Sequence, residues 1–265
     1  MNWFSRFDKT LPIITAKNHM ASSHGKSTVD NIPRTCCIFH FGSAMDFITK
    51  HYDITTVLDR TPNFLENRKI IEIKGIPNVC FVQGCYGSPA AVDLLETLFA
   101  LGVEKIVSAG MCGGFSKKVK LGDVIIPDRI LCEEGTSHHY SKNPKWIKPD
   151  INLHLQAMNY FSSTQRTYSL STVTTDAIYR QTYYKEIIWR KKKCIGVDME
   201  SSAILSVSNY YKKASVVILF ISDIHPKNEN EEKWNWISED VLNNKENMIN
   251  NCIDFCAKIE YERFS

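Results

Sequence analysis

Short, unbroken apolar runs constrain the fold of this chain more than any other feature of its sequence. The run SVVILFIS (215–222) is the strongest, and TCCIFHF (35–41) is similar. Further runs with strand character lie at residues 69–74, 79–83, 104–110, 123–127 and 167–173. An apolar run without polar alternation is typical of a strand that is buried on both faces. The chain therefore predicts a central sheet that is covered on both sides.

Segments with helical periodicity separate several of these strands. Apolar side chains recur at helical spacing in residues 90–101 and 238–260, and a third helix is expected over 200–212. Strands that alternate with helices favour a mainly parallel sheet. We therefore predict a single three-layer α/β domain over residues 35–265, with a twisted, mainly parallel central sheet flanked by helices. Residues 1–34 are polar and irregular and are expected to form an N-terminal arm or cap.

Composition excludes several classes of protein. With 43% hydrophobic and 23% charged residues, the chain of 265 residues is neither disordered nor a coiled coil as a whole. Its net charge of +3 is too small to indicate a nucleic-acid-binding protein. No apolar stretch is long enough to cross a bilayer, and the N-terminus lacks the apolar core of a signal peptide. We therefore expect a cytoplasmic protein without a membrane or nucleic-acid partner.

Cysteine usage agrees with that location. The nine cysteines lie mostly within apolar runs, and no CxxC pair is present. Buried, reduced thiols are therefore expected in preference to disulfides or a metal site. Such thiols are typical of cytosolic proteins.

Glycine-bearing loops follow three of the predicted strands. They are HFGSAMD (40–46), GCYGSP (84–89) and SAGMCGGF (108–115). Glycine allows a backbone to approach an anion with its N–H groups exposed, although each loop alone is also explained by simple turn chemistry. None of the three is a Walker loop or a GxGxxG fingerprint. Because ligands bind beyond the carboxyl ends of strands in such sheets, three loops together favour a shared ligand crevice.

The segment CEEGTSHHY (132–140) concentrates polar side chains in nine residues. Its adjacent histidines suggest a metal site, but no HExxH spacing is present and no further histidine lies nearby. A loop that orders a substrate or a neighbouring subunit is preferred. We therefore take His139 as a candidate substrate contact and predict no metal.

Two acidic segments are candidates for catalysis. GVDMESSA (196–203) places Asp198 and Glu200 at the start of a predicted helix, where they either stabilise the helix dipole or accept both hydroxyls of a vicinal diol. Asp223 follows directly after the most apolar strand. A carboxyl group in such a partly dry place is expected to have a raised pKa and to act as a general acid.

The order of these motifs resembles the nucleoside phosphorylase superfamily, which includes purine nucleoside phosphorylases, uridine phosphorylases and nucleoside hydrolases. The resemblance covers residues 35–256 and depends on GCYGSP, SAGMCGG, LGDVIIP, EGTSHHY, TTDAIY, VDMESSA and the final ISD. It implies that Glu200 binds the ribose 2′ and 3′ hydroxyls while Met199 packs under the sugar. It also implies that Asp223 protonates or hydrogen-bonds the purine N7.

The resemblance assigns further site residues. Ile178 and Tyr179 occupy positions where the family has aromatic residues against the base. Gly42 and Ser43 belong to the first anion-binding loop, and residues 108–114 line the second. Of these, Ser108 is expected to contact phosphate, and Ser108 and Gly110 to contact the substrate.

Two departures from the family concern phosphate. The phosphorylases carry an arginine where this chain has Asp46 and another where it has Ser108, and they have a small hydroxyl residue in place of Met111. Arg34, Arg129 or a neighbouring subunit's arginine would have to replace the missing cations. Hydrolysis is the rival to phosphorolysis, with Asp46 activating a water molecule.

The sequence thus predicts a glycosyltransferase that cleaves the N-glycosidic bond of a nucleoside, a purine nucleoside by preference, with phosphate. The products would be free base and ribose-1-phosphate. Inorganic phosphate is the co-substrate, and no cofactor is expected. The alternatives are a nucleosidase that uses water and a catalytically weak nucleoside-binding protein. By analogy with the family, the protein is expected to form a homo-oligomer, either a dimer or a hexamer.

Overall fold

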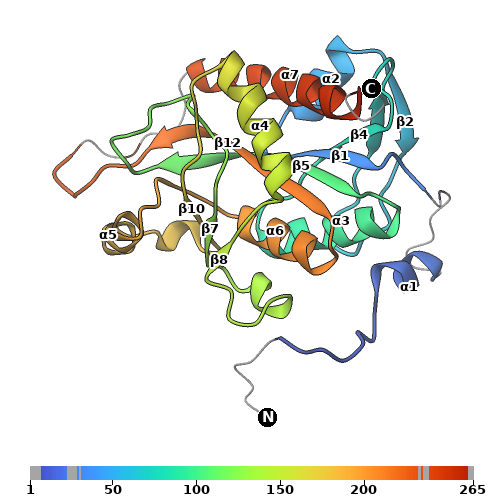
Figure 1. Cartoon of the computed structure of the whole chain (residues 1–265), viewed down its shortest axis with the longest axis horizontal. Helices are drawn as coiled ribbons and strands as arrows, with labels where there is room; N and C mark the ends of the chain where they lie inside the picture. Colours follow the sequence, from blue (N-terminus) through green and yellow to red (C-terminus); the bar gives the residue numbers. More distant parts are fainter. Residues whose placement is uncertain (1–6, 23–28, 30, 232–233, 235–238, 262–265) are drawn as a thin grey trace.

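The computed structural model describes residues 7–22, 29, 31–231, 234 and 239–261. One mixed sheet forms the centre of a single α/β domain, and helices cover both of its faces (Figure 1). The strands are β1 (Thr35–Phe39), β2 (Ile54–Leu58), β3 (Ile70–Ile73), β4 (Val79–Gln83), β5 (Lys105–Gly114), β6 (Val124–Ile125), β7 (Ile130–Glu133), β8 (Trp146–Ile147), β9 (Thr167–Tyr168), β10 (Thr172–Thr175), β11 (Gly196–Asp198) and β12 (Ala214–Ile224). The helices are α1 (Ala16–Ala21), α2 (Ala44–His51), α3 (Ser88–Ala100), α4 (Ile151–Thr164), α5 (Tyr183–Lys191), α6 (Ser201–Tyr210) and α7 (Glu239–Tyr261), with the 3-10 turns η1 (Thr136–His139) and η2 (Ile178–Arg180).

Parallel pairing dominates the middle of the sheet. Strand β1 pairs in parallel with β4 and β5, and β5 pairs in parallel with β12. The end of β5 pairs antiparallel with β11. Strand β11 pairs in parallel with β10, and β10 pairs in parallel with β7. The carboxyl end of β5, at Gly113 and Gly114, therefore lies between β11 and β12, and the loops beyond β5 and β12 share one edge of the sheet.

Two apolar layers hold the helices on the sheet. Helices α2, α4 and α7 cover one face, where Phe41, Phe161, Phe220 and Phe255 are buried together (Figure 1). Helices α3 and α6 pack on the other face through residues such as Leu98 and Ile204. Because the central strands are buried on both faces, their sequences are unbroken apolar runs.

The predicted fold class is confirmed, and several element boundaries are corrected. Strand β12 continues to Ile224, so Asp223 lies inside the strand and not in the loop after it. The single strand predicted over 167–173 is two strands, β9 and β10. Helix α3 begins at Ser88, two residues before the prediction, because Pro89 is well suited to a first turn. Residue 238, the predicted start of the last helix, lies outside the described residues.

Elements without a strong local signal were not predicted. They include α2, α5, β7 and β11, which are short or only partly apolar. In the N-terminal segment, the described part contains α1, which packs against α3. The boundary between an arm and the domain at residue 34 stays a prediction.

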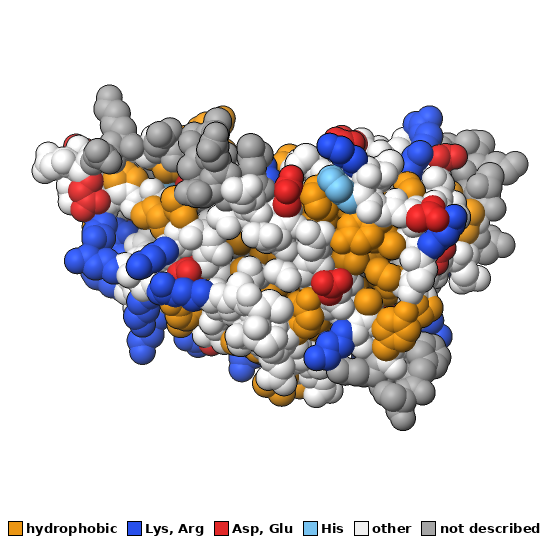
Figure 2. All heavy atoms as spheres, turned by 90° about the horizontal axis from the view of Figure 1, so that it is seen from above, with side chains coloured by type: hydrophobic (Ala, Val, Ile, Leu, Met, Phe, Trp, Pro, Cys, Tyr) orange, Lys and Arg blue, Asp and Glu red, His pale blue; other side chains and the backbone are white. Residues whose placement is uncertain are grey.

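The cysteines are free thiols, as the sequence predicts, and the surface carries charges of both signs. All nine cysteines are free, and all but Cys132 are buried. In the part of the chain that the structure describes, no helix is both long and apolar enough to cross a membrane. The face in Figure 2 intersperses basic, acidic and hydrophobic side chains and does not present one continuous basic surface.

Candidate active site

A cavity of about 650 Å³ lies where the ends of β5, β11 and β12 meet the loops around η2 and after β12. This is the edge of the sheet at which the sequence predicts a ligand crevice. Five of the predicted site residues line it: Ile178, Tyr179, Met199, Glu200 and Asp223. The structure therefore brings the predicted sugar, base and acid residues together from three separate segments.

Asp198 and Glu200 lie two residues apart but have different surroundings. The Oδ2 atom of Asp198 accepts the backbone N–H groups of Glu200 and Ser201 at 3.2 and 2.7 Å, and its Oδ1 atom accepts the Thr174 hydroxyl at 2.7 Å. Asp198 thus has the helix-terminal role that was one alternative for this segment. Glu200, in contrast, accepts the backbone N–H of Gly87 at 2.6 Å, and its other hydrogen-bonding partner is the backbone of Met199.

Glu200 is therefore a buried carboxyl group of the cavity wall that has no side-chain donor among the described residues. It is buried, and this burial together with the nearby charge of Asp198 raises its pKa to about 8. Its contact with Gly87 also ties the GCYGSP loop to the start of α6. A carboxyl group with unused acceptor sites at a cavity wall is suited to bind hydroxyl groups.

Asp223 lies opposite Gly113 in the pairing of β12 with β5 and has three side-chain donors. The Ser222 hydroxyl donates to its Oδ1 atom at 2.6 Å, and the Trp234 indole N–H donates to its Oδ2 atom at 2.6 Å. The His225 Nε2 atom lies 3.1 Å from the same Oδ2 atom. Burial alone would raise the pKa of Asp223, but these donors lower it below its ordinary value. The prediction of a raised pKa for Asp223 is therefore wrong.

His225 and Glu186 are site residues that the sequence analysis missed. The His225 Nδ1 atom lies 2.6 Å from Glu186 Oε1, so the imidazole is held between two carboxylates, and its pKa is raised to about 9. Glu186 also pairs with Arg190 at 3.0 Å, one turn along α5. His225 had a local signal, because it stands two residues after Asp223 and such residues share one side of an extended segment. Glu186 had none.

Aromatic and apolar side chains form the rim of the cavity. Ile178 and Tyr179 lie on η2 and are 45% and 95% exposed, and Tyr86 and Tyr183 contribute to the same lining. Met199 lies between Asp198 and Glu200 and completes the apolar part of the wall. A flat ring entering between these side chains would find mostly apolar contacts.

The comparison with known sequences gives a family for this arrangement. The profile of the family described as "Phosphorylase superfamily" matches residues 35–255. The chain belongs to the phosphorylase superfamily. Relatives include an uncharacterized protein of Acanthamoeba polyphaga mimivirus, 26% identical over 66% of this chain and 68% of its own length. A DeoD-type purine nucleoside phosphorylase of Brevibacillus brevis is 27% identical over 48% of this chain and 55% of its own length. The match thus spans only about half of that enzyme.

Solved structures agree on the fold. Purine nucleoside phosphorylase from Toxoplasma gondii, in complex with immucillin-H, aligns over 88% of this chain and 93% of its own, with a TM-score of 0.74 and 19% identity. AMP nucleosidase from Bacteroides thetaiotaomicron aligns over 94% of this chain and 98% of its own, with a TM-score of 0.74 and 18% identity. Among the curated sequence relatives are nucleoside-cleaving enzymes of two kinds. Besides the phosphorylase above, a 5′-methylthioadenosine/S-adenosylhomocysteine nucleosidase of Buchnera aphidicola is 30% identical over 46% of this chain and 56% of its own length.

The structure of this phosphorylase-superfamily chain does not bring the other predicted site residues to the cavity lining. Gly42 and Ser43 are exposed at the start of α2, and Ser108 and Gly110 are buried within β5. His139 is exposed on η1. The phosphate-binding and substrate-binding roles of these residues stay predictions, without a cavity contact in support.

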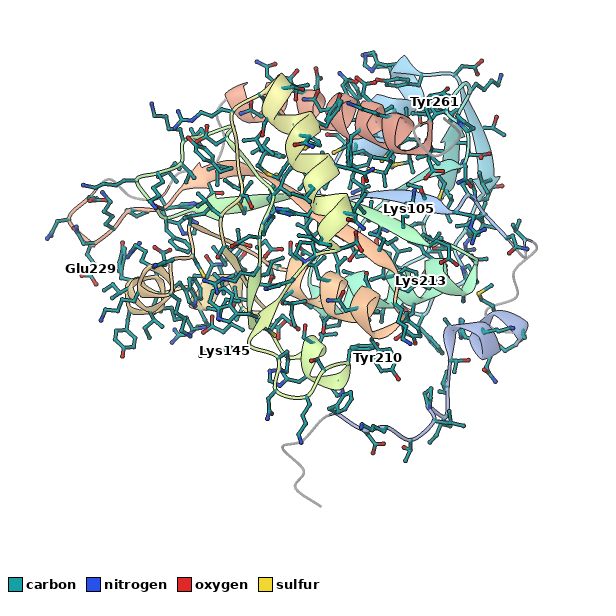
Figure 3. All side chains as sticks on the ribbon, in the orientation of Figure 1. Lys105, Lys145, Tyr210, Lys213, Glu229 and Tyr261 are labelled. Carbon is teal, nitrogen blue, oxygen red and sulfur yellow. The ribbon has the colours of Figure 1, made fainter. Side chains whose placement is uncertain are left out.

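Lysine and arginine are missing from the described lining as well. No lysine or arginine occurs among the described residues that border the cavity. Arg34 pairs with Glu104 at the opposite end of the strands, and Arg129 stacks on Trp146, so neither takes the place of the missing arginines. Figure 3 likewise shows Lys105 and Lys213 far from Glu229, a cavity residue in the loop after β12.

Asp46 does not have the position that the hydrolysis hypothesis gave it. Its side chain is exposed on the first turn of α2 and does not line the cavity. The expectation that Asp46 activates a water molecule therefore has no support in the structure.

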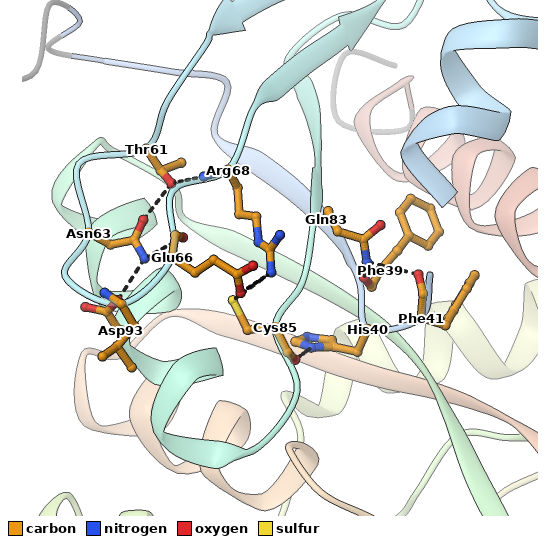
Figure 4. Close-up of polar contacts among 11 residues, drawn as sticks. Phe39, His40, Phe41, Thr61, Asn63, Glu66, Arg68, Gln83, Cys85 and Asp93 are labelled. Carbon is orange, nitrogen blue, oxygen red and sulfur yellow. Dashed lines mark hydrogen bonds and ion pairs between the residues drawn. The ribbon is translucent and has the colours of Figure 1, made fainter. Parts of the chain in front are cut away.

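His40 is a cavity residue that the sequence analysis did not single out. Its Nδ1 atom lies 2.8 Å from the backbone carbonyl oxygen of Cys85, and its buried Nε2 atom has no protein partner (Figure 4). Burial lowers the pKa of His40 to about 4, so the ring is neutral at neutral pH. Its Nδ1–H therefore donates to the carbonyl, and Nε2 keeps a free lone pair.

Proposed function

We propose that this protein is a nucleosidase that hydrolyses the N-glycosidic bond of a purine nucleoside without a 5′ phosphate. The observation that carries the proposal is the charge of the cavity. Five carboxyl groups line it, from Glu186, Asp198, Glu200, Asp223 and Glu229, and the described lining contains no lysine or arginine. His225 also lines the cavity, but both of its ring nitrogen atoms face carboxylates. A phosphate dianion would therefore find no free cationic donor among the described lining residues and would be repelled by the carboxylates.

The same charge favours the chemistry of bond cleavage. As the glycosidic bond breaks, positive charge develops on the ribosyl ring, and fixed carboxylates stabilise that charge without reorganising. Glu200 would accept the 2′ and 3′ hydroxyls and hold the sugar, with Met199 beneath it. Water is the nucleophile that needs no cationic site.

The leaving base would be bound at Asp223. A purine between the apolar rim and β12 would place its N7 atom near the carboxyl group, which hydrogen-bonds or protonates it as negative charge develops. Ile178 and Tyr179 would contact the ring face. Purine specificity is supported by relatives such as the Brevibacillus enzyme, a purine nucleoside phosphorylase.

Phosphorolysis is the second candidate. It is favoured by the curated relatives that are phosphorylases, including a guanosine phosphorylase of Halorubrum lacusprofundi and a uridine phosphorylase of Thermococcus kodakarensis. This chain would then need its phosphate-binding cations from a second copy of the chain or from residues outside the described part.

A product assay separates the two. The purified protein is incubated with inosine, adenosine, uridine, methylthioadenosine and AMP, with and without phosphate, and free base, ribose and ribose-1-phosphate are measured. We expect free ribose or its 5′-thio analogue from purine nucleosides at a rate that phosphate does not change, and no cleavage of AMP.

Other outcomes contradict the proposal in distinct ways. Ribose-1-phosphate formed only with phosphate would establish phosphorolysis. Binding of nucleosides without release of base would identify a nucleoside-binding protein. Cleavage of uridine alone would refute the assignment of the purine.

A further inference from the structure

The imidazole of His225 lies between two carboxylates, at 3.1 Å from Asp223 Oδ2 and 2.6 Å from Glu186 Oε1. From this arrangement we infer that His225 is the proton reservoir of the reaction, acting through Asp223 on the leaving base. The inference rests on the proposed cleavage of a purine nucleoside. It adds two positioning residues, His225 and Glu186, to the residues that would touch the substrate.

Hydrogen bonding by itself indicates a doubly protonated ring. A neutral imidazole has one N–H group and one lone pair, so it satisfies one carboxylate and turns a lone pair toward the other. Only the imidazolium donates to Glu186 and Asp223 at once. The pKa of His225, raised to about 9, agrees with that state at neutral pH.

The charged groups around His225 favour its protonated form. Asp223 faces it from β12, Glu186 faces it from α5, and Glu229 lies in the same cavity after β12. Arg190 offsets part of the charge of Glu186 but bonds to its other oxygen, Oε2. Two direct carboxylate contacts against one indirect cation leave the imidazole in a negative environment.

Asp223 alone is a poor source of a proton. Its three donors lower its pKa below its ordinary value, so this carboxyl group is ionised at pH 7. A general acid needs the proton at the moment when the base leaves. The neighbouring imidazolium supplies it without requiring Asp223 to be protonated beforehand.

The proton balance follows from the contacts. As the C1′–N9 bond breaks, its electron pair goes to the purine. The ionised Asp223 takes the Nε2 proton of His225 and passes a proton to N7 in the same step. Asp223 is then again a carboxylate, and His225 is a neutral imidazole whose Nδ1–H still donates to Glu186. The water that adds to C1′ releases one proton to solvent, and solvent returns one proton to His225 for the next cycle.

The backbone makes room for this ring. A Cβ atom on Gly113 would lie 2.3 Å from His225 Nε2, well inside van der Waals contact. Gly113 therefore lets the imidazole lie against β5 and reach Asp223. The ring of Phe115 lies near the same imidazole, with its centroid 6.5 Å away.

Two kinds of measurement test the inference, starting with protonation. The pKa of His225 in the unliganded protein is measured by NMR, with His225→Gln used to assign the signal. We expect a value near 9 that falls by at least one unit in Glu186→Gln. A His225 pKa at or below 6.5 would overturn the inference even if the protein cleaves nucleosides as proposed.

The second measurement is kinetic and uses two leaving groups. His225→Gln should lower kcat/KM for inosine by ~10²-fold or more, within the range of a lost general acid. It should change kcat/KM for 4-nitrophenyl riboside only a few-fold, because that leaving group needs no proton. Glu186→Gln should move the alkaline limb of the inosine pH profile from about 9 to lower pH.

A control variant and the pattern of results distinguish failure of the proton-reservoir role from failure of the proposed function. His51→Gln, an exposed histidine on α2 outside the cavity, should leave both substrates unchanged. Equal losses on both substrates in His225→Gln, or an alkaline limb unmoved in Glu186→Gln, would refute the proton-reservoir role. A wild-type protein that cleaves no nucleoside would refute the proposed function instead, and the NMR result would still decide the charge state of His225.

Discussion

Replacing Glu200 by glutamine should stabilise the protein while impairing its activity. The carboxyl group is buried beside Asp198, and its pKa is raised from 4.5 to about 8. A raised carboxyl pKa means that the folded state resists deprotonation, so the folded protein is penalised as the pH rises above 4.5. Glutamine has the same shape and no charge, and its amide oxygen still accepts the Gly87 N–H group.

The magnitude follows from the pKa. One pKa unit corresponds to about 1.4 kcal/mol, and the penalty accumulates from pH 4.5 to the pH of the experiment until it levels off near 8. At pH 7 the free energy of unfolding should therefore rise by about 3 kcal/mol in Glu200→Gln. For a chain of this size, that corresponds to an increase in Tm of roughly 6–12 °C.

Thermal unfolding of both proteins between pH 4.5 and 8 measures this effect. The gain should be absent near pH 4.5 and grow with pH. At pH 8, where about half of the Glu200 carboxyl groups are ionised, kcat/KM for a riboside should fall ~10- to 150-fold because an ionisable hydrogen-bond acceptor is lost. Glu246→Gln, at an exposed position on α7, is the matched control and should change neither quantity. A Tm gain that is independent of pH, or a loss of stability, would refute the assignment of the buried charge. Unchanged activity would refute the role in sugar binding.

Three further outcomes are expected. Asp223→Asn should slow cleavage of purine nucleosides by ~10²–10⁴-fold with the fold intact by circular dichroism; a smaller effect would place the acid elsewhere. Gly113→Ala should impair activity and shift the His225 NMR signal, because the new methyl group displaces the imidazole; an unshifted signal would contradict the geometry. Glu260→Ala should lower the free energy of unfolding in urea by ~3–5 kcal/mol, because the buried carboxylate accepts from Lys105 at 2.7 Å; a change under 1 kcal/mol would contradict this.

The central strands were predictable because their signal is local. Strands β1, β4 and β12 lie between covering helices, so each is apolar over most of its length, and the runs at 35–41 and 215–222 show this directly. Helix α5 had no comparable signal, since only Glu186 and Trp189 are buried on it and most of its face is solvated. Helix α5 matters for the site because its Glu186 contacts His225, and the composition of the helix does not predict this contact.

Some features of the candidate site were likewise predictable from local sequence, and others were not. By itself, the sequence determined that an acidic residue stands near the end of the strongest strand and that Glu200 lies at the start of a helix. It also determined that these positions match the motifs of a nucleoside-cleaving family. Each of these features depends on residues that are close together in the sequence, so side-chain periodicity and motif spacing are enough to predict it.

Only the tertiary structure decided the charge states. The pKa of Asp223 is lowered and not raised because Trp234 and His225 donate to it, and His225 is charged because Glu186 arrives from another helix. The apolar strand predicted only the burial of Asp223, and burial by itself raises the pKa of this carboxyl group. A pKa is the sum of burial and of partners supplied by distant segments, and the fold alone decides which partners meet.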